Sequence, residues 1–582
     1  MSEYNQTSFT GGMNLLLDDT RLQPNQYRLG INLRNRYDTL DEIPNSLLDE
    51  TLPVGIIQEV LTFGNYVVAF VSGFGYYRLV TERAWTQING FAMNNNARRY
   101  WTAAVPVATT NYGRISAQVA IDGITDKQSQ SNAAVYQLNS AATAAAGNLP
   151  GLLVQDNINQ PMFIFIGANG LVQARTTQTY DQWTAAYDAT TGNLTVDERE
   201  YVPVGNVMAF VDGVLYITAQ DGNVIYRSVS GRPLDFVVNV GIDGAKGGDA
   251  LTTSYSVGVG SISCLRAMPD GSLFVAASNS NFIVQKNMTM NAPTLFGEYT
   301  FIRKFLFEAT CLNDRCIIDS LGDTRFIDLT GVRSFNAILQ LQNEGRNSPF
   351  TSIIQAMLKG IVQDVAAAVL YDNYEFYALN TVIGPVIAVY DTLNTCWSSF
   401  DTTQTGGSKV KAFAKIELAE RALFAITEDN KLYQLYAADT FATATCLTLS
   451  VSANLLNANQ NVKMNNAKSE IKVSDFRCIL NRITQDSTVS LTLLVDNRAS
   501  ATGTVLKSIT YVPPVTPYVS DVILLDVNTQ LTNLYWMLAN TEQGWKTAFI
   551  IQWTGGGSIT QFSTTLSDLN PMNPLMTQST TV

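Results

Sequence analysis

Short antiparallel hairpins recur along the middle of this chain at nearly regular intervals. Their turns fall at Gly73, Asn169, Gly213, Gly271, Gly322, Asn373 and Asn430, so successive turns are 96, 44, 58, 51, 51 and 57 residues apart. Repeats of roughly 40–50 residues that each hold several strands are typical of β-propeller blades. A β-sandwich of unrelated hairpins is the alternative, with turns every ~8–12 residues. The spacing predicts an all-β chain whose centre is a β-propeller of about six to eight blades.

The clearest of these units runs from Gly205 to Phe236, with the sequence GNVMAFVDGVLYITAQDGNVIYRSVSGRPLDF. Apolar, β-branched and aromatic residues alternate on both sides of Asp212-Gly213, as they do in half-buried strands. Asp-Gly between two such runs is a strong hairpin signal, because glycine adopts the positive φ that a tight turn requires. A second turn at 221–223 extends the unit to three antiparallel strands.

The pattern divides the chain into three parts. Residues 1–50 lack the repeat and predict an N-terminal arm, extended and packed against another part of the molecule. Residues 51–441 predict the propeller, with an insertion at about 88–160 that is rich in Asn, Gln and Ala. Residues 442–582 alternate in longer runs without the blade spacing and predict a C-terminal β-sandwich. Within the propeller, residues 352–358 have helical apolar spacing and predict a short helix packed on a blade.

Charge is scarce in this sequence. Only 15 % of the 582 residues are charged, against about a quarter in ordinary soluble proteins, and the net charge is −12. No cluster of Lys and Arg suited to gripping nucleic-acid phosphates is visible. The acidity is expected to serve solubility, and an acidic lining for a passage through which DNA slides is the alternative. No apolar run could span a bilayer and no signal peptide is visible, so we expect a soluble, cytoplasmically made protein without membrane insertion.

The residues available for catalysis are few. The chain has no histidine, which excludes Ser–His–Asp and Cys–His arrangements and His-based metal sites. The six cysteines are scattered and are expected to be reduced and buried. Acidic residues at Asp18-Asp19, Asp197-Glu198 and Asp270 leave a glycosidase formally open, but they lie in expected turns or loops. We therefore predict no enzymatic activity, no catalytic residue, no cofactor and no metal site.

Aromatic residues close to the predicted turns allow two interpretations. They could stack against sugars, or they could fill the cores of blades and sandwich, which is the favoured reading. The residues concerned are Tyr76, Tyr77, Trp183, Trp397 and Trp545.

The beginning of the chain, TSFTGGMNLLLDDTRLQPNQYRLGINLRNRYDTL, resembles the start of tail proteins from short-tailed bacteriophages. The residues that carry this resemblance are Gly11, Gly12, Asp18, Pro24, Gln26, Tyr27, Asn32 and Arg34. The segment VLYITAQDGNVIYRSVSGRPLDF and the W-S-S-F sequence at Trp397–Phe400 are similar to segments of the same proteins. The resemblance touches most of residues 7–440.

This resemblance implies a tail nozzle subunit, also called a head-to-tail stabilisation or tail tubular protein. Such a subunit would be a structural virion protein, usually one of six in a ring, that contacts portal-side and adaptor-side tail proteins, retains packaged DNA and conducts it during ejection. The 88–160 insertion is then the best candidate for an element that narrows the channel. The alternative is a receptor-binding or carbohydrate-binding propeller at the tail tip.

Overall fold

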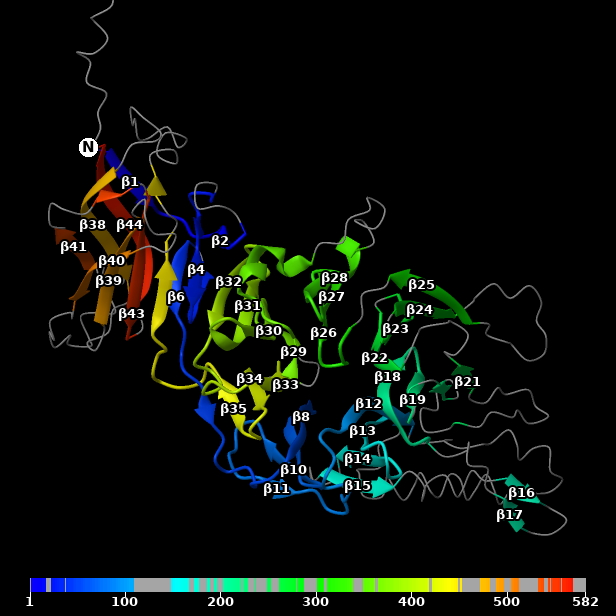
Figure 1. The fold of residues 1–582 in the computed structure, drawn as a ribbon. Coiled ribbons are helices and arrows are strands. Elements are labelled where there is room, and N and C mark those ends of the chain that lie inside the picture. The colour runs from blue at the N-terminus through cyan, green and yellow to red at the C-terminus, as the bar shows by residue number, and fades with distance from the viewer. Residues whose placement is uncertain are drawn as a thin grey trace, which may run out of the picture.

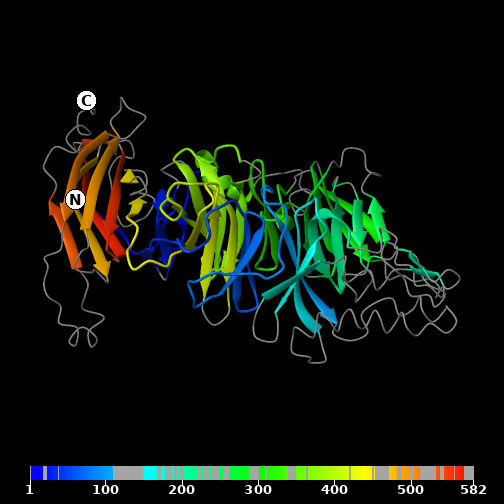
Figure 2. The same cartoon turned by 90° about the horizontal axis from the view of Figure 1, so that it is seen from below.

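Seven antiparallel units of three or four strands succeed one another along residues 47–435 and surround a common centre in the computed structural model (Figure 1). The first four blades are β8 (Ile57–Phe63) to β11 (Thr86–Gln87), β12 (Trp101–Ala108) to β15 (Val172–Thr176), β18 (Gly205–Val211) to β21 (Asp249–Thr252), and β22 (Ile262–Ala267) to β25 (Phe301–Phe307). The last three are β26 (Ile317–Ser320) to β28 (Gly331–Ser334), β29 (Ala367–Tyr371) to β32 (Cys396–Asp401), and β33 (Val410–Ile416) to β35 (Leu432–Leu435). Seen from the side, the blades form a disc (Figure 2). The fold is a β-propeller, as the spacing predicted.

The structure describes residues 2–568 with several gaps. The gaps are 17–21, 37, 109–147, 167–171, 177–185, 189–192, 196–201, 221, 223, 229–235, 237–248, 253–260, 269, 279, 287–300, 308–310, 339–348, 362–364, 418–420, 449–450, 453–470, 482–487, 497–503, 512–531, 538–542, 545 and 556. Within the described part, the sheets make seven blades.

The middle strands of the blades are β9 (Tyr66–Val71), β10 (Phe74–Leu79), β13 (Asn148–Gln155), β14 (Met162–Ile166), β19 (Val214–Ala219), β20 (Val224–Arg227), β23 (Leu273–Ala277), β24 (Ser280–Lys286), β27 (Asp323–Asp328), β30 (Tyr374–Thr381), β31 (Gly384–Asp391) and β34 (Ala422–Thr427). A separate hairpin joins β16 (Ala186–Asp188) to β17 (Asn193–Thr195).

The disc closes where the first and last blades meet. β33 lies beside β8, and apolar side chains of the two blades share one buried core that includes Val60, Val67, Ala412 and Phe424. β7 (Leu47–Leu48) pairs antiparallel with β35 and so supplies the outer strand of blade seven from the N-terminal side of the chain. Ring closure therefore uses a strand that precedes the first blade.

The predicted turns lie between consecutive blade strands wherever the structure describes them. Asp212 and Gly213 both have positive φ, at 47° and 77°, and connect β18 to β19. This is the backbone that a two-residue hairpin with right-handed strand twist requires. The turns at Gly73, Gly271, Gly322, Asn373 and Asn430 also have positive φ, whereas the turn predicted near Asn169 lies outside the described residues.

Two further sheets pack face to face beside the disc as the C-terminal β-sandwich, at the left of Figure 1. One contains β1 (Ser2–Gln6), β5 (Leu33–Arg36), β6 (Thr39–Glu42), β38 (Ile471–Asn481), β41 (Thr532–Met537), β42 (Gln543–Gly544) and β44 (Ser558–Asp568). The other contains β4 (Leu29–Ile31), β36 (Ala444–Leu447), β37 (Val451–Ser452), β39 (Thr488–Asp496), β40 (Thr504–Tyr511) and β43 (Lys546–Thr554).

Blade six continues into the sandwich without a break. β32 pairs with β4, and β4 pairs with β36, so that one sheet of ten strands runs from the blade into the sandwich. The region expected as an N-terminal arm, 1–50, thus supplies strands to both sandwich sheets and to blade seven. A short parallel pair, β2 (Gly12–Met13) with β3 (Gln26–Tyr27), lies at the same junction.

The prediction of an irregular insertion at about 88–160 needs a correction. β12 and β13 fall inside it and form the first two strands of blade two, with eight residue pairs in register. Residues 109–147 separate these strands in sequence, so no contiguous hairpin signal marks them, and Pro and Gly interrupt the alternation in β13. Residues 109–147, the central part of this stretch and of the narrowing element proposed for it, lie outside the described residues.

The short helix predicted at 352–358 is present as η3 (Phe350–Met357), a 3₁₀-helix rather than an α-helix. It begins after Pro349 and has no side-chain cap. Ile354 is fully buried, and Phe350 and Ile353 pack against the same core. Its apolar face therefore contacts a blade, as expected.

Candidate functional site

Several of the residues that carry the phage-tail resemblance meet in space although they lie more than 360 positions apart in sequence. Gly12 faces the Trp397–Phe400 strand so closely that a Cβ atom on it would lie 2.5 Å from the carbonyl oxygen of Trp397. Tyr27 is fully buried, and its hydroxyl donates a 2.6 Å hydrogen bond to the carbonyl oxygen of Ser398. We call this contact between residues 9–36 and blade six the joint.

Arg34 forms the centre of the joint. Its guanidinium donates to both carboxylate oxygens of Asp401, at 3.0 and 2.6 Å, and to the hydroxyl of Ser399 at 3.1 Å. The hydroxyl of Tyr436 donates to the same carboxylate at 2.7 Å. Rings of Tyr374, Phe376 and Tyr436 lie 4.9–5.6 Å from the guanidinium carbon. This is a sealed, bidentate ion pair inside an aromatic cage.

Burial and pairing oppose each other at this ion pair. The side chains of Arg34 and Asp401 are 10 % and 0 % exposed. Burial by itself would lower the pKa of Arg34, but the charge and hydrogen bonds of Asp401, together with Tyr436 and Tyr374, outweigh burial and the pKa is raised. For Tyr436, burial and then the charge of Asp401 raise the pKa well above its usual value. At neutral pH the Arg34 guanidinium therefore stays protonated and the Tyr436 phenol stays neutral.

The other residues of the resemblance behave differently from one another. Asn32, with φ at 54°, accepts a 2.9 Å hydrogen bond from the backbone of Thr402 and thus also belongs to the joint. Gly11 packs against Asn25, and Gln26 is half-buried, whereas Pro24 is exposed. Asp18 lies outside the described residues.

A pocket of about 570 Å³ lies on the axis of the propeller. Every blade contributes to its wall near the beginning of its first strand, through Ile56, Trp101, Asn206, Ser263, Arg315, Val365 and Lys411. The volume falls within the range of about 300–1,000 Å³ that is usual for small-molecule sites.

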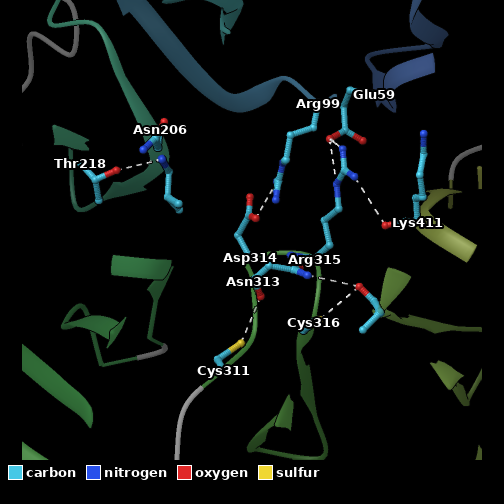
Figure 3. Close-up of polar contacts among 12 residues, drawn as sticks. Glu59, Arg99, Asn206, Thr218, Cys311, Asn313, Asp314, Arg315, Cys316 and Lys411 are labelled. Atoms are coloured by element: carbon cyan, nitrogen blue, oxygen red, sulfur yellow. Dashed lines mark hydrogen bonds and ion pairs between the residues drawn. The ribbon is translucent and has the colours of Figure 1, made fainter. Parts of the chain in front are cut away.

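Two ion pairs cross the axis at this pocket (Figure 3). Arg315, just before blade five, donates to Glu59 of blade one at 2.5 and 3.2 Å. Arg99, just before blade two, donates to Asp314 at 2.6 Å. In the close-up, the two arginine side chains lie side by side and run in opposite directions. Because each pair joins blades that are not neighbours, side chains obstruct the centre of the disc.

Arg99 forms a strong ion pair with Asp314, but one of its hydrogen-bond donors has no partner. Burial would lower its pKa, but the charge of Asp314, the charge of Glu59 and the hydrogen bond to Asp314 together outweigh burial, and the pKa is raised. Its guanidinium carbon lies 4.9 Å from the ring centroid of Trp101. Its Nε atom is nevertheless buried without a hydrogen-bond partner, and so is the side-chain oxygen of Asn206 on the same wall. Buried polar atoms of this kind are costly unless something completes them.

Lys411 faces the same pocket from blade seven. Its ammonium group donates to the side-chain oxygen of Asn430 at 2.9 Å. Burial, and then the neighbouring charge of Arg315, lower the pKa of Lys411. The acids nearby, Glu59 and Glu428 among them, do not fully offset these two effects.

The cysteines are buried and free at all six positions, as expected. Cys264, Cys311 and Cys316 lie together near the axis, and burial raises the pKa of both Cys311 and Cys316. The thiol of Cys316 donates to the carbonyl oxygen of Ala366. Raised pKa values keep these thiols protonated and make them poor nucleophiles.

Of the aromatic residues singled out in the sequence, Tyr77 and Trp397 are buried in the core, as favoured. Tyr76 packs half-buried against the core shared by blades one and seven. Trp183 and Trp545 lie outside the described residues.

Of the acidic residues considered for hydrolysis, the structure describes only Asp270. Asp270 accepts hydrogen bonds from the backbone and hydroxyl of Ser272 and stabilises its turn. Asp19, Asp197 and Glu198, like Asp18, fall within gaps of the description. Among the described residues, no group of three or more Cys, Asp or Glu side chains could hold a metal ion. No helix in the described ranges has the length and apolarity needed to cross a membrane.

The axial pocket was missed by sequence reasoning. Arg98-Arg99 stood out only as part of the supposed insertion, and Arg315 and Lys411 carried no local signal. The usable signal is positional: each of these residues lies within a few positions of the start of a blade's first strand. Reading it requires the correct strand boundaries in every blade.

No protein-family profile and no curated protein matches the sequence. Solved structures with a similar fold include a streptogramin B lyase, with 8 % identity, a TM-score of 0.35, and coverage of 68 % of this chain and 97 % of that one. YCF48 from Cyanidioschyzon merolae has 10 % identity, a TM-score of 0.30, and coverage of 66 % and 97 %. Virginiamycin B lyase from Staphylococcus aureus has 9 % identity, a TM-score of 0.34, and coverage of 67 % and 98 %. Likenesses this distant carry no argument about function.

Proposed function

We propose that the chain is a structural, non-enzymatic subunit of a phage virion, one of six in a tail nozzle ring that retains DNA and conducts it during ejection. The observation that carries the proposal is the joint. Gly12, Tyr27, Asn32 and Arg34, which carry the resemblance to tail nozzle proteins, all lie against Thr402 or the strand that holds the W-S-S-F sequence. Two of the three resembling segments, the beginning of the chain and the W-S-S-F strand, thus share one structural task, whereas the third lies in blade three.

That task is to hold propeller and sandwich as one body. The ten-stranded sheet passes from blade six into the sandwich, and the buried ion pair of Arg34 with Asp401 fastens its side. A subunit of a closed ring must keep the angle between its interface surfaces, because an error at each contact would prevent closure. A stiff two-domain body suits such a building part.

In this proposal DNA passes along the axis of the ring, between subunits, and not through a propeller. The ion pairs of Arg99 and Arg315 cross the propeller's own axis. The net charge of −12 is compatible with a ring lining that repels phosphates and lets DNA slide. Portal-side and adaptor-side tail proteins would be the neighbours of the ring, in the virion, after synthesis in the host cytoplasm.

Cryo-electron microscopy of purified particles tests the proposal. The expected result is six copies of this chain in a ring between the portal and the tail tip, with DNA density on the ring axis. Particles that lack the chain, with the protein found only as a free monomer in the lysate, would reject it.

The alternative, a carbohydrate-binding propeller at the tail tip, has one observation in its favour. Trp101 lines an open axial pocket of ligand size. Glycan binding by the purified protein that disappears in Trp101→Ala, together with peripheral placement in particles, would favour this alternative over the nozzle.

A further inference from the structure

The wall of the axial pocket has the opposite electrostatic character from the protein as a whole. The chain carries a net charge of −12, yet the charged residues that line the pocket are Arg98, Arg99, Arg315 and Lys411 against the single acid Glu428. The carboxylates of Glu59 and Asp314 pair with two of the arginines but do not line the pocket. A cleft with clustered charge of one sign concentrates ligands of the other.

The hydrogen-bonding groups of the wall are incomplete in a specific way. The Nε donor of Arg99 is buried without a partner, although the rest of the guanidinium is held by Asp314. The side-chain oxygen of Asn206 is a buried acceptor without a partner. Both atoms lie behind the surface of the pocket, so the wall contains polar groups that are not fully satisfied.

Arg99 is held in a fixed position in the wall of the pocket. Its guanidinium is clamped between the carboxylate of Asp314 and the ring of Trp101. A donor held in advance loses little side-chain entropy when a ligand arrives. Lys411 adds a charge whose lowered pKa, from burial and the proximity of Arg315, would rise beside an anion.

We infer that the axial pocket binds a small molecule with an anionic oxygen group, phosphate or carboxylate. The anionic group lies against the cations of the wall, Arg99, Arg315 and Lys411. The site is independent of the nozzle role, so the failure of one leaves the other standing.

Isothermal titration calorimetry on the purified full-length protein tests this, with ribose 5-phosphate, gluconate and neutral ribose as probes. One or both anions are expected to bind with a dissociation constant below about 1 mM at low salt, and to weaken as ionic strength rises. Neutral ribose is expected to bind at least about 10-fold more weakly.

The variants separate the pocket from general effects. Arg99→Gln and Lys411→Met should each weaken anion binding by about 10-fold or more. Arg421→Gln, which removes an exposed arginine paired with Asp372 away from the axis, should leave it unchanged. Thermal unfolding curves establish that each variant is folded. Because there are two pocket variants, the test can still be made if one of them does not fold.

Three results would overturn the inference: no binding of either anion at about 20 mM, binding of ribose as tight as that of ribose 5-phosphate, or equal weakening by Arg421→Gln. Equal binding of ribose would instead favour neutral sugar recognition. Preference for ribose 5-phosphate over gluconate identifies phosphate as the group selected, and the reverse identifies carboxylate.

Discussion

The joint and the axial pocket are built from the same chemical parts and differ in how completely those parts are enclosed. Each holds an arginine against a carboxylate at 2.6 Å with an aromatic ring about 5 Å from the guanidinium carbon. At the joint the pair is 10 % and 0 % exposed, whereas at the pocket it is 20 % and 25 % exposed. A fully enclosed pair holds two parts of the protein together, whereas a partly exposed pair leaves charged surface that a ligand can contact.

The largest effect should come from breaking the sealed pair. Arg34→Leu leaves the carboxylate of Asp401 buried without its counter-charge and should lower the free energy of unfolding by about 3–5 kcal/mol. Denaturant unfolding followed by tryptophan fluorescence measures it, since Trp397 lies in the same strand as Asp401.

Arg36→Gln is the matched control for this variant. Arg36 lies two residues along the same strand, but its pair with Asp372 is 37 % and 39 % exposed. Exposed pairs contribute about 0–1 kcal/mol, so its loss should be small. Similar losses for both variants would show that the sealed cage does not set the strength of the joint.

The next largest loss of stability should come from a substitution at Gly12, where the backbone of the N-terminal segment closely approaches blade six. Gly12→Ala should cost about 1–3 kcal/mol, because residue 12 has φ at 65° and a new Cβ would lie 2.5 Å from the carbonyl oxygen of Trp397. Gly271→Ala is the control: φ is 78°, but nothing lies within 4 Å of the new atom. Apparent melting temperatures of the two variants separate the close approach from the backbone strain, and equal shifts would argue against a tight contact.

The pocket pair should matter less for stability than the joint pair. Arg99→Gln leaves Asp314 in contact with solvent, so we expect a loss of about 1 kcal/mol in the free energy of unfolding. The same denaturant titration that measures Arg34→Leu measures this variant. If Arg99→Gln lowered the free energy of unfolding as much as Arg34→Leu does, the axial ion pair would be as important for stability as the pair at the joint.

The sequence predicted those features of the fold that depend on neighbouring residues, and it missed features that depend on residues far apart. The hairpin turns, such as Asp212-Gly213 and Asn373, could be predicted because their signals lie in contiguous residues. These signals are residue types that adopt positive φ and the alternating residues on either side. The all-β fold and the propeller followed from their spacing. Blade two was hidden because β12 and β13 are far apart in sequence, and the 3₁₀ form of η3 depends on its packing.

The joint and the pocket were harder to predict from the sequence, because the residues that form each of them lie far apart in the chain. The resemblance marked Gly12 and Arg34 on one side and Trp397–Phe400 on the other, but nothing in the residues themselves says that the two segments touch. The partner of Arg34, Asp401, lies one position beyond the W-S-S-F sequence. At the pocket, Arg99, Arg315 and Lys411 converge only because seven blades close into a ring, so their meeting depends on the whole topology.

The smallest predicted effect concerns Lys411 and pH. Burial and the charge of Arg315 lower its pKa in the folded state, despite the opposing charges of Glu59, Glu428 and Asp429. Between that lowered pKa and the unfolded value near 10.4, the unfolded chain binds more protons, so the stability of the native protein rises with pH in this window. Below the window the penalty of holding the charge is fully present.

Lys411→Met removes that penalty together with the hydrogen bond to Asn430, so we expect a net gain of no more than about 1 kcal/mol at neutral pH. The difference between variant and native protein should shrink as pH rises toward about 10. Urea unfolding of both proteins at several pH values measures it, and titrations elsewhere cancel in the difference. If the difference in free energy of unfolding between the two proteins widened with pH, Lys411 would be stabilised in its charged form. The pocket would then already supply enough negative charge without a ligand.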